Sequence, residues 1–402
     1  MLLEILLAIE IGIILGIFTG LSPGIHINLV ASILLSSLSI PLLSSLEPIS
    51  LALFIVSMSI THTIIDFIPS IYLGAPNEDT FLSILPSHEL MKQGLGHTAF
   101  ILTAYGSLVA IPIIIIYTPI FINFLPVIFT STKAIIPFLL IFISFYLIFR
   151  EEKTLVSIIV FFLAGILGFL TFNLPVKEPL LPLLSGLFGL SSLFLSLTST
   201  EKPQKQTIQP LKEIYISKKE LLKSSCSAFL IAPFFSFLPG LSSSHATTIS
   251  SELFNLQKKS FLFLSGAVNM IIMSLSFITV YTIGKSRTGS AAAVLDILKT
   301  INQNHIIIII ATIILVSLIS FVIGIHLSKL AAKFINIINY KVLTIIVISI
   351  IILINIILSN WLGILILITS TSLAIFTIQS NSRRINLMAA LIVPAIIYYL
   401  MN

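Results

Sequence analysis

Apolar runs long enough to cross a membrane recur along the whole chain, and this feature limits the possible folds more than any other. A helix needs about 20 mainly apolar residues to span the hydrocarbon core of a bilayer. The 402 residues are 57% hydrophobic and only 9% charged, whereas soluble proteins carry about 25% charged residues. We therefore predict an all-α fold, a polytopic transmembrane helical bundle of about 14 segments.

A Lys-rich hydrophilic stretch divides the apolar runs into two groups. We predict transmembrane repeat 1 over residues 1–198, a cytoplasmic linker over 199–224 and transmembrane repeat 2 over 225–402. Similar motifs follow in a similar order in both halves, and Tyr72 corresponds to Tyr281 in this comparison. The order indicates an internal duplication, although chance similarity between Ile-rich helices is the alternative.

The basic residues predict how the two repeats are oriented. Seven crossings per half is an odd number, so the second repeat is expected to be inverted relative to the first. With the linker in the cytoplasm, 16 of the 21 Lys and Arg residues fall on that side and five on the other. Basic loops concentrate on the cytoplasmic side of membrane proteins. We therefore expect a multi-pass protein of the plasma membrane with both termini outside.

A short polar motif interrupts an apolar run once in each half. Residues 20–28 read GLSPGIHIN, and residues 237–248 read FLPGLSSSHATT. Proline lacks an N–H and glycine adopts positive φ, so each Pro-Gly pair stops a helix. Matching breaks in the two halves of a membrane protein indicate the binding site of a secondary transporter. The alternative is a pair of ordinary turns.

The helices that restart after these breaks present free N–H groups and a positive dipole end, which together favour an anion. We expect the two tips to meet near the middle of the membrane, the first entering from the cytoplasm and the second from outside. The predicted substrate-binding residues are Ser22, Pro23, Gly24, His26, Asn28, Pro239, Gly240, Ser242, Ser243, Ser244 and His245.

Two ionisable residues inside an apolar segment are candidates for binding a coupling ion. His62 and Asp66 are four positions apart and share one helix face. Such residues are costly in lipid and usually face an interior cavity. They are expected to relay a proton or hold a cation, or else to form a structural hydrogen bond. The polar stretch 71–97 that follows is either a re-entrant or lid element beside the Pro-Gly site or an extramembrane loop.

Two motifs of enzymatic chemistry are missing from the sequence. It contains no HExxH of a zinc protease and no GxxxxGK[ST] phosphate-binding loop. Its single cysteine, Cys226, excludes a multi-cysteine metal site and an intramolecular disulfide. The net charge of +6 is what basic cytoplasmic loops produce and does not indicate nucleic-acid binding. We expect no enzymatic activity, no metal site and no cofactor apart from H⁺ or Na⁺ as coupling ion.

Three motifs in order resemble the TctA permease, the large membrane subunit of tripartite tricarboxylate transporters, and its archaeal relatives of undefined function. They are Gly20-Leu21-Ser22-Pro23-Gly24, the stretch Tyr72–Pro76 with His88–Gly94, and Pro239-Gly240 through Ala246 followed by Glu252. The resemblance covers most of the chain. It implies a permease that works with a small membrane subunit and an extracytoplasmic solute receptor.

The chain also departs from this family at the two Pro-Gly loops. Ile25-His26 and Ser242 to His245 replace glycines of the family pattern, and the chain is short, so citrate-like substrates do not follow from the resemblance. We expect a secondary transporter, a symporter for a small organic anion such as a carboxylate, driven by H⁺ or Na⁺. The alternatives are a translocase for a polyprenyl-phosphate-like lipid carrier and a structural membrane protein without transport activity.

Overall fold

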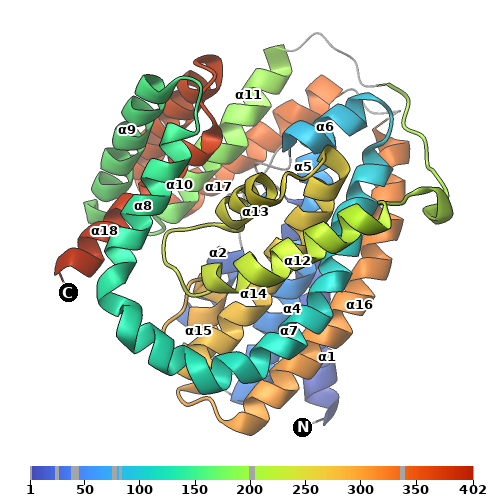
Figure 1. Ribbon diagram of the computed structural model, residues 1–402, viewed down its shortest axis with the longest axis vertical. Helices are drawn as coiled ribbons and strands as arrows, with labels where there is room; N and C mark the ends of the chain where they lie inside the picture. Colours follow the sequence, from blue (N-terminus) through green and yellow to red (C-terminus); the bar gives the residue numbers. More distant parts are fainter. Residues whose placement is uncertain are drawn as a thin grey trace.

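Helices account for nearly all of the structure, a computed structural model that describes residues 2–22, 27–37, 45–74, 79–80, 84–198, 204–335 and 340–401. No strand occurs in these ranges, so the predicted all-α bundle is confirmed (Figure 1). The first half contains α1 (Leu2–Leu21), α2 (Ile27–Ser36), α4 (Pro48–Ile65), α5 (Phe67–Leu73), α6 (Ile84–Lys92), α7 (Gly96–Thr132), α8 (Ile136–Phe149), α9 (Thr154–Asn173), α10 (Leu180–Leu184) and α11 (Ser191–Thr198), with a π-helical turn at Ser185–Leu190. The second half contains α12 (Lys218–Phe235), α13 (Ser243–Phe254), α14 (Lys258–Ile283), α15 (Gly289–Leu298), α16 (Gln303–Phe334), α17 (Tyr340–Gln379) and α18 (Ala389–Met401).

Within the described residues, nine helical segments are long and apolar enough to cross a membrane. Two of them form the centre of the bundle: the apolar window of the α4–α5 segment is fully buried, and that of α14 is 94% buried. In α1, α9 and α17 only about a third of the corresponding window is buried. Apolar side chains therefore cover the outer helices as well as the core, which is the arrangement expected when lipid is the surrounding solvent.

The most extensive helix–helix contact joins the two halves of the chain. α14 packs against α7, and a Cβ atom added at Gly106 or Gly266 would overlap the backbone of the opposite helix. The Ser107 hydroxyl donates a hydrogen bond to the Gly266 carbonyl at 3.3 Å across this contact. Small residues let membrane helices approach this closely and gain van der Waals contact.

α7 bends as it leaves this contact and leads into α8 as a wide arc (Figure 1). Pro112, Pro119 and Pro126 lie inside the helix, and each removes a backbone hydrogen bond on the path of the bend. A short 3-10 turn at Lys133–Ile135 then begins α8. The arc carries Phe129 to the opening of the pocket described below.

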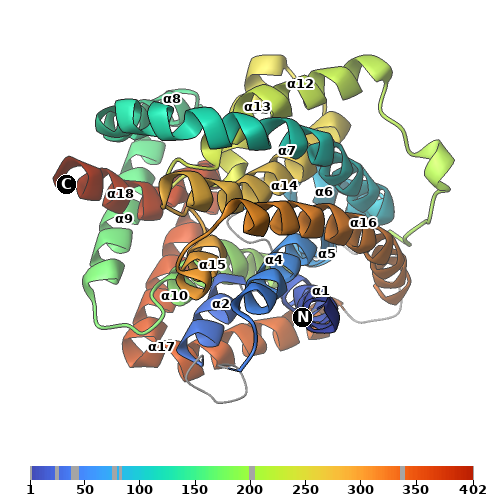
Figure 2. The same ribbon diagram turned by 90° about the horizontal axis from the view of Figure 1, so that it is seen from below.

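The two halves repeat one order of elements. A buried helix ends at a left-handed glycine, Gly74 (φ 62°) in the first half and Gly284 (φ 63°) in the second. A short helix follows, α6 or α15, and then a long one, α7 or α16. This order is the one that a duplication predicts, while the inverted orientation of the halves stays a prediction. The halves are interleaved, since α2 lies beside α15 (Figure 2).

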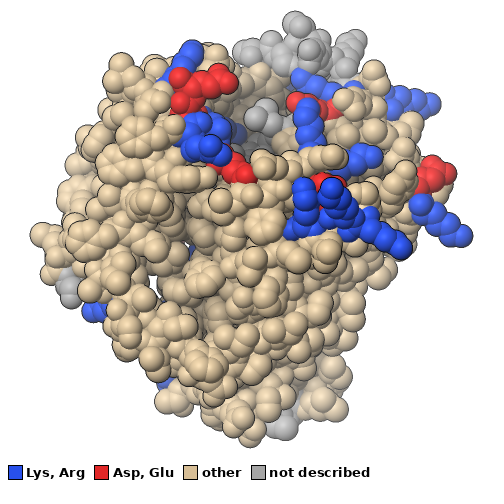
Figure 3. All heavy atoms as spheres, in the orientation of Figure 1, with Lys and Arg blue, Asp and Glu red and all other residues tan. Residues whose placement is uncertain are grey.

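Part of the predicted linker is bound to the first half. Gln206 is buried and accepts a hydrogen bond from the Gly96 N–H at 3.0 Å, while its amide donates to the Met91 carbonyl at 2.8 Å. The Thr207 N–H donates to the Gly94 carbonyl at 2.8 Å. These bonds fix residues 204–209 on the turn between α6 and α7. Lys and Arg side chains gather at this end of the molecule (Figure 3).

Candidate functional site

The second Pro-Gly break begins α13. Gly240 has a φ of 73°, a conformation that glycine adopts without strain, and it ends the turn that follows α12. α13 then starts at Ser243, with Ser242 as its N-cap residue. Ser243 and Ser244 are fully buried, so this polar helix start lies inside the protein rather than in bulk water. A membrane protein tolerates such a break where it lines a cavity or is covered by protein.

His245 lies one turn into α13 and is also fully buried. Its Nδ1 accepts a hydrogen bond from the Ser242 backbone N–H at 3.1 Å and lies 3.0 Å from the Ser242 hydroxyl. A nitrogen that accepts from a backbone N–H carries no proton, so the neutral ring is protonated on Nε2. Nε2 is buried and has no hydrogen-bond partner among the described residues. The helix start thus holds a buried donor in addition to its backbone amides.

A carboxylate from the first half lies at the N-terminus of α13. Oδ1 of Asp79 accepts hydrogen bonds from the Ser243 N–H at 3.0 Å and the Ser243 hydroxyl at 2.9 Å. The Arg287 guanidinium lies 3.6 Å from the same oxygen, and its Nε–H donates to the Leu241 carbonyl at 2.8 Å. Asp79 belongs to the predicted lid stretch 71–97, and this part of the stretch lies beside the second Pro-Gly site.

The first Pro-Gly loop is represented by its flanks. Pro23, Gly24 and His26 lie outside the described residues, and Ser22 is a partly buried bend at the end of α1. On the other side of the loop, Oδ1 of Asn28 accepts a hydrogen bond from the Ser290 N–H at 3.1 Å. Asn28 therefore caps the N-terminus of α15. Residues 287–290 thus connect the surroundings of the two Pro-Gly loops: Arg287 contacts Asp79 and Leu241 beside the second loop, and Ser290 contacts Asn28 after the first.

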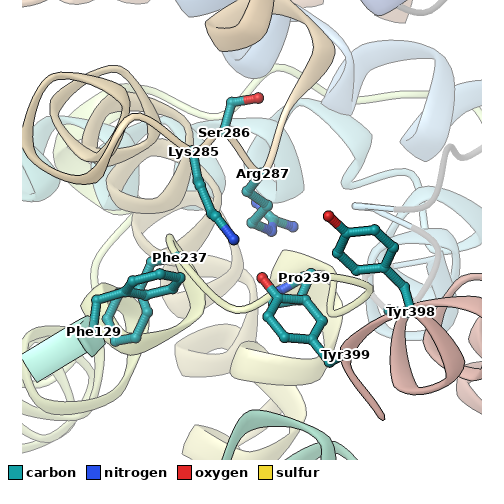
Figure 4. Close-up of a pocket in the computed structure, with 9 residues that line it drawn as sticks. Phe129, Phe237, Pro239, Lys285, Ser286, Arg287, Tyr398 and Tyr399 are labelled. Atoms are coloured by element: carbon teal, nitrogen blue, oxygen red, sulfur yellow. The ribbon is translucent and has the colours of Figure 1, made fainter. Parts of the chain in front are cut away.

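A cavity of about 350 Å³ opens beside Pro239 (Figure 4). Arg287 and Lys285 both line it. The Lys285 ammonium lies 5.4 Å from the centre of the Phe129 ring and 5.5 Å from that of Tyr399. The remaining lining residues are Phe237, Ser286, Ala395 and Tyr398. Two cations in a largely aromatic pocket are chemically complementary to an anion that has an apolar part.

The two predicted coupling residues lie where α4 gives way to α5. His62 and Asp66 are both buried, and Nδ1 of His62 lies 3.0 Å from the Thr19 hydroxyl near the end of α1. A chain of hydrogen bonds leads from here toward the α13 tip. The Ser70 hydroxyl donates to the Asp66 carbonyl at 2.9 Å, and the Thr80 hydroxyl lies 2.8 Å from that of Ser70. Thr80 directly follows Asp79.

The far end of α13 is tied down by ion pairs. Glu252 accepts from Arg383 at 2.8 Å and from Arg150 at 3.2 Å. Burial alone would raise the pKa of the Glu252 carboxyl, but the two guanidinium groups outweigh it and lower this pKa. In neighbouring Glu151, burial dominates and raises the pKa despite Arg383 nearby. α13 is thus held by charged side chains at both of its ends.

Sequence reasoning did not identify Lys285, Arg287, Tyr398 and Tyr399 as site residues. In the sequence the two cations have the character of ordinary loop charges, and a Tyr-Tyr pair in a C-terminal apolar helix carries no local signal of binding. The one sequence signal for Lys285 and Arg287 is the short polar stretch GKSRTG (284–289), which corresponds to the polar stretch after Tyr72 in the first half. Among the described residues, no three His, Cys, Asp or Glu side chains gather as a metal ion would require.

The bundle of long apolar helices defines a multi-pass membrane protein, and it contains a buried helix break beside a largely aromatic cavity with two cations. Comparison with protein families gives the particular class. The profile of the tripartite tricarboxylate transporter TctA family matches residues 6–389, so the chain belongs to this family. The protein is a membrane permease of that family.

One relative extends this result to archaea. The chain is 32% identical to an uncharacterized protein of Methanocaldococcus jannaschii over 362 residues, which cover 86% of this chain and 88% of the relative. No solved structure matches the chain. The predicted resemblance to TctA and to an archaeal relative of undefined function is therefore confirmed.

Proposed function

We propose that the protein is a secondary active transporter for a small organic anion, and that a carboxylate group of the substrate binds beside the N-terminus of α13. One observation carries this proposal: a cavity that holds Lys285 and Arg287 adjoins a buried helix start where a carboxylate is already bound. Helix N-termini and arginine both favour carboxylates. The family supports transport, and the cavity supports an anionic substrate.

The driving ion is proposed to act at His62 and Asp66. Both are buried at the interruption between α4 and α5, and an intramembrane acid with a nearby histidine is suited to proton relay or cation binding. Two hydrogen bonds connect the backbone carbonyl of Asp66 through Ser70 to Thr80, which directly follows Asp79 in the chain. A substrate anion and a cation bound at the two ends of this path would partly neutralise each other.

Ligand-dependent thermal stability of the purified protein tests the substrate class. Acetate, succinate and citrate are compared with sulfate at equal ionic strength, since a bound ligand raises the melting temperature by mass action. Uptake into proteoliposomes under an imposed H⁺ or Na⁺ gradient then tests transport and coupling. The proposal requires stabilisation by at least one carboxylate and gradient-dependent uptake of the same compound. Stabilisation by none of the carboxylates would refute it.

A lipid-carrier translocase is the second candidate. Phe129, Phe237, Tyr398 and Tyr399 give the cavity an aromatic lining that suits an apolar chain as well as an anionic head group. The same assay includes a short-chain polyprenyl phosphate in detergent. Stabilisation by this lipid and by none of the carboxylates would favour the translocase, and no stabilisation with no uptake would favour a structural role.

Orientation is proposed from the charge distribution: both termini outside and the linker in the cytoplasm of a plasma-membrane protein. Lys205 is exposed on the bound part of the linker, so a cysteine placed there in a Cys226-free background is accessible to a reagent. Labelling of intact cells with a membrane-impermeant maleimide is expected to spare position 205 and to label it only after lysis. Labelling from outside would reverse the orientation. The small membrane subunit and the solute receptor are proposed partners on the strength of the family alone.

A further inference from the structure

Asp79 is bound as a ligand would be. A single carboxylate oxygen, Oδ1, receives the backbone N–H and the hydroxyl of Ser243 and faces the Arg287 guanidinium. The Asp79 backbone carbonyl accepts a further hydrogen bond from the Ser244 hydroxyl at 2.8 Å, and it lies 3.2 Å from the Ser243 hydroxyl, which has one proton to share between this carbonyl and Oδ1. A helix amide, a hydroxyl and a guanidinium are the donors that proteins use to bind a free carboxylate.

These donors are buried, so leaving them without an acceptor is energetically unfavourable. The side chains of Arg287 and Asp79 are only 10% and 14% exposed, and Ser243 is fully buried. A buried guanidinium or amide without an acceptor is unfavourable, because water does not replace the lost hydrogen bond. One carboxylate can leave these donors readily only when another takes its place.

One of these donors, Arg287, is also reachable from the cavity. Arg287 lines the 350 Å³ cavity and contacts Asp79, so a ligand in the cavity meets the same guanidinium that holds Asp79. Lys285 lines the cavity too and supplies a first attraction for an anion. A carboxylate in the cavity can therefore contact Arg287 while Asp79 still occupies the donors of Ser243.

We infer that Ser243 and Arg287 form a carboxylate subsite, that Asp79 fills it when substrate is absent, and that a substrate carboxylate displaces Asp79 on binding. This inference rests on the proposed function. It makes Asp79 an internal competitor of the substrate. The competition lowers the apparent affinity by the fraction of molecules in which the subsite is free.

Removal of the internal carboxylate gives the first test. Asp79→Ala is expected to lower the melting temperature of the full-length protein, and sodium acetate is expected to restore it in a concentration-dependent way beyond sodium chloride at the same ionic strength. Asp296→Ala is the matched control, because Asp296 is an exposed acid on α15. Wild type and the control should respond to acetate less than Asp79→Ala does. Equal acetate effects in all three proteins would overturn the subsite.

Affinity gives the second test, and it serves if Asp79→Ala does not fold. Asp79→Asn keeps the shape and removes the competing charge. For a carboxylate that stabilises wild type, this variant should bind roughly tenfold tighter or more if the subsite is free in a tenth of wild-type molecules or fewer. Unchanged or weaker binding would overturn the inference while the proposed function stands. A different result would be that acetate restores the melting temperature of Asp79→Ala while no carboxylate binds to wild type. This result would support the carboxylate subsite and refute the proposed function.

Discussion

The pairing of Arg287 with Asp79 predicts that Arg287→Gln destabilises the protein and that Asp79→Asn restores part of this stability in the double variant. Arg287→Gln removes the hydrogen bond to the carbonyl of Leu241, whose side chain is buried, and leaves Asp79 without its cation. An orphaned buried carbonyl costs about 1–3 kcal/mol. A fully buried ion that loses its partner costs about 3–5 kcal/mol, and less here because Asp79 keeps both hydrogen bonds from Ser243. We expect a total loss of roughly 2–4 kcal/mol.

The double variant separates the two contributions. Asp79→Asn in the Arg287→Gln background removes the uncompensated charge, so the double variant should be more stable than Arg287→Gln alone. We expect a coupling energy on the order of 1–3 kcal/mol, which is the range for residues in one ion-pair network. Melting temperatures and denaturant unfolding of the four proteins in detergent give this cycle.

A matched control checks for a general effect of charge. Lys177→Gln removes an exposed cation, and it should change stability by no more than about 0.5 kcal/mol. If the effects of Arg287→Gln and Asp79→Asn simply add, the two side chains do not interact energetically. The reasoning that makes Asp79 a bound ligand would then fail.

Lys285→Gln should weaken binding of a stabilising carboxylate about three- to tenfold with a small change in melting temperature, since its cation–π contacts are each worth about 0.5–1 kcal/mol; unchanged binding would exclude Lys285 from the site. Asp66→Asn should retain substrate binding but lose the dependence of uptake on pH or Na⁺, whereas an early-melting variant with normal coupling would indicate a structural role. Gly106→Ala should destabilise the protein by about 1–3 kcal/mol through overlap with α14, while the same change at Gly189, where a Cβ meets only an ordinary contact, should have a smaller effect. The pKa of Glu252 is lower in the folded protein than the usual carboxyl value of 4.5, so ionised Glu252 stabilises the fold above that pH. This contribution should be lost as the pH falls through the lower folded pKa. Glu252→Gln should remove that part of the acid transition in pH-dependent melting.

Local properties of the sequence were sufficient for the class of fold and the position of the broken helix. Apolar character adds up residue by residue, so runs of apolar residues identify membrane-spanning helices without knowledge of their neighbours. The break at Gly240 is local for the same reason: proline lacks a donor, and glycine adopts the φ of 73° that the turn requires. The hydrophilic stretch after residue 198 was equally visible, but its docking was not. Gln206 binds backbone groups, and backbone groups have no sequence signature.

The chemistry of the site was decided by tertiary structure. Asp79 and Ser243 are 164 positions apart and meet only because the two halves of the chain interleave around α4 and α14. Lys285 and Tyr399 come together through packing of the arc of α7 and the last helix beside one loop. A cation in a loop either contributes only to the orientation of the protein in the membrane or lines a cavity as a binding group, and the helices that surround it decide which. That choice is made by long-range packing, so it could not be read from the residues near Arg287 in sequence.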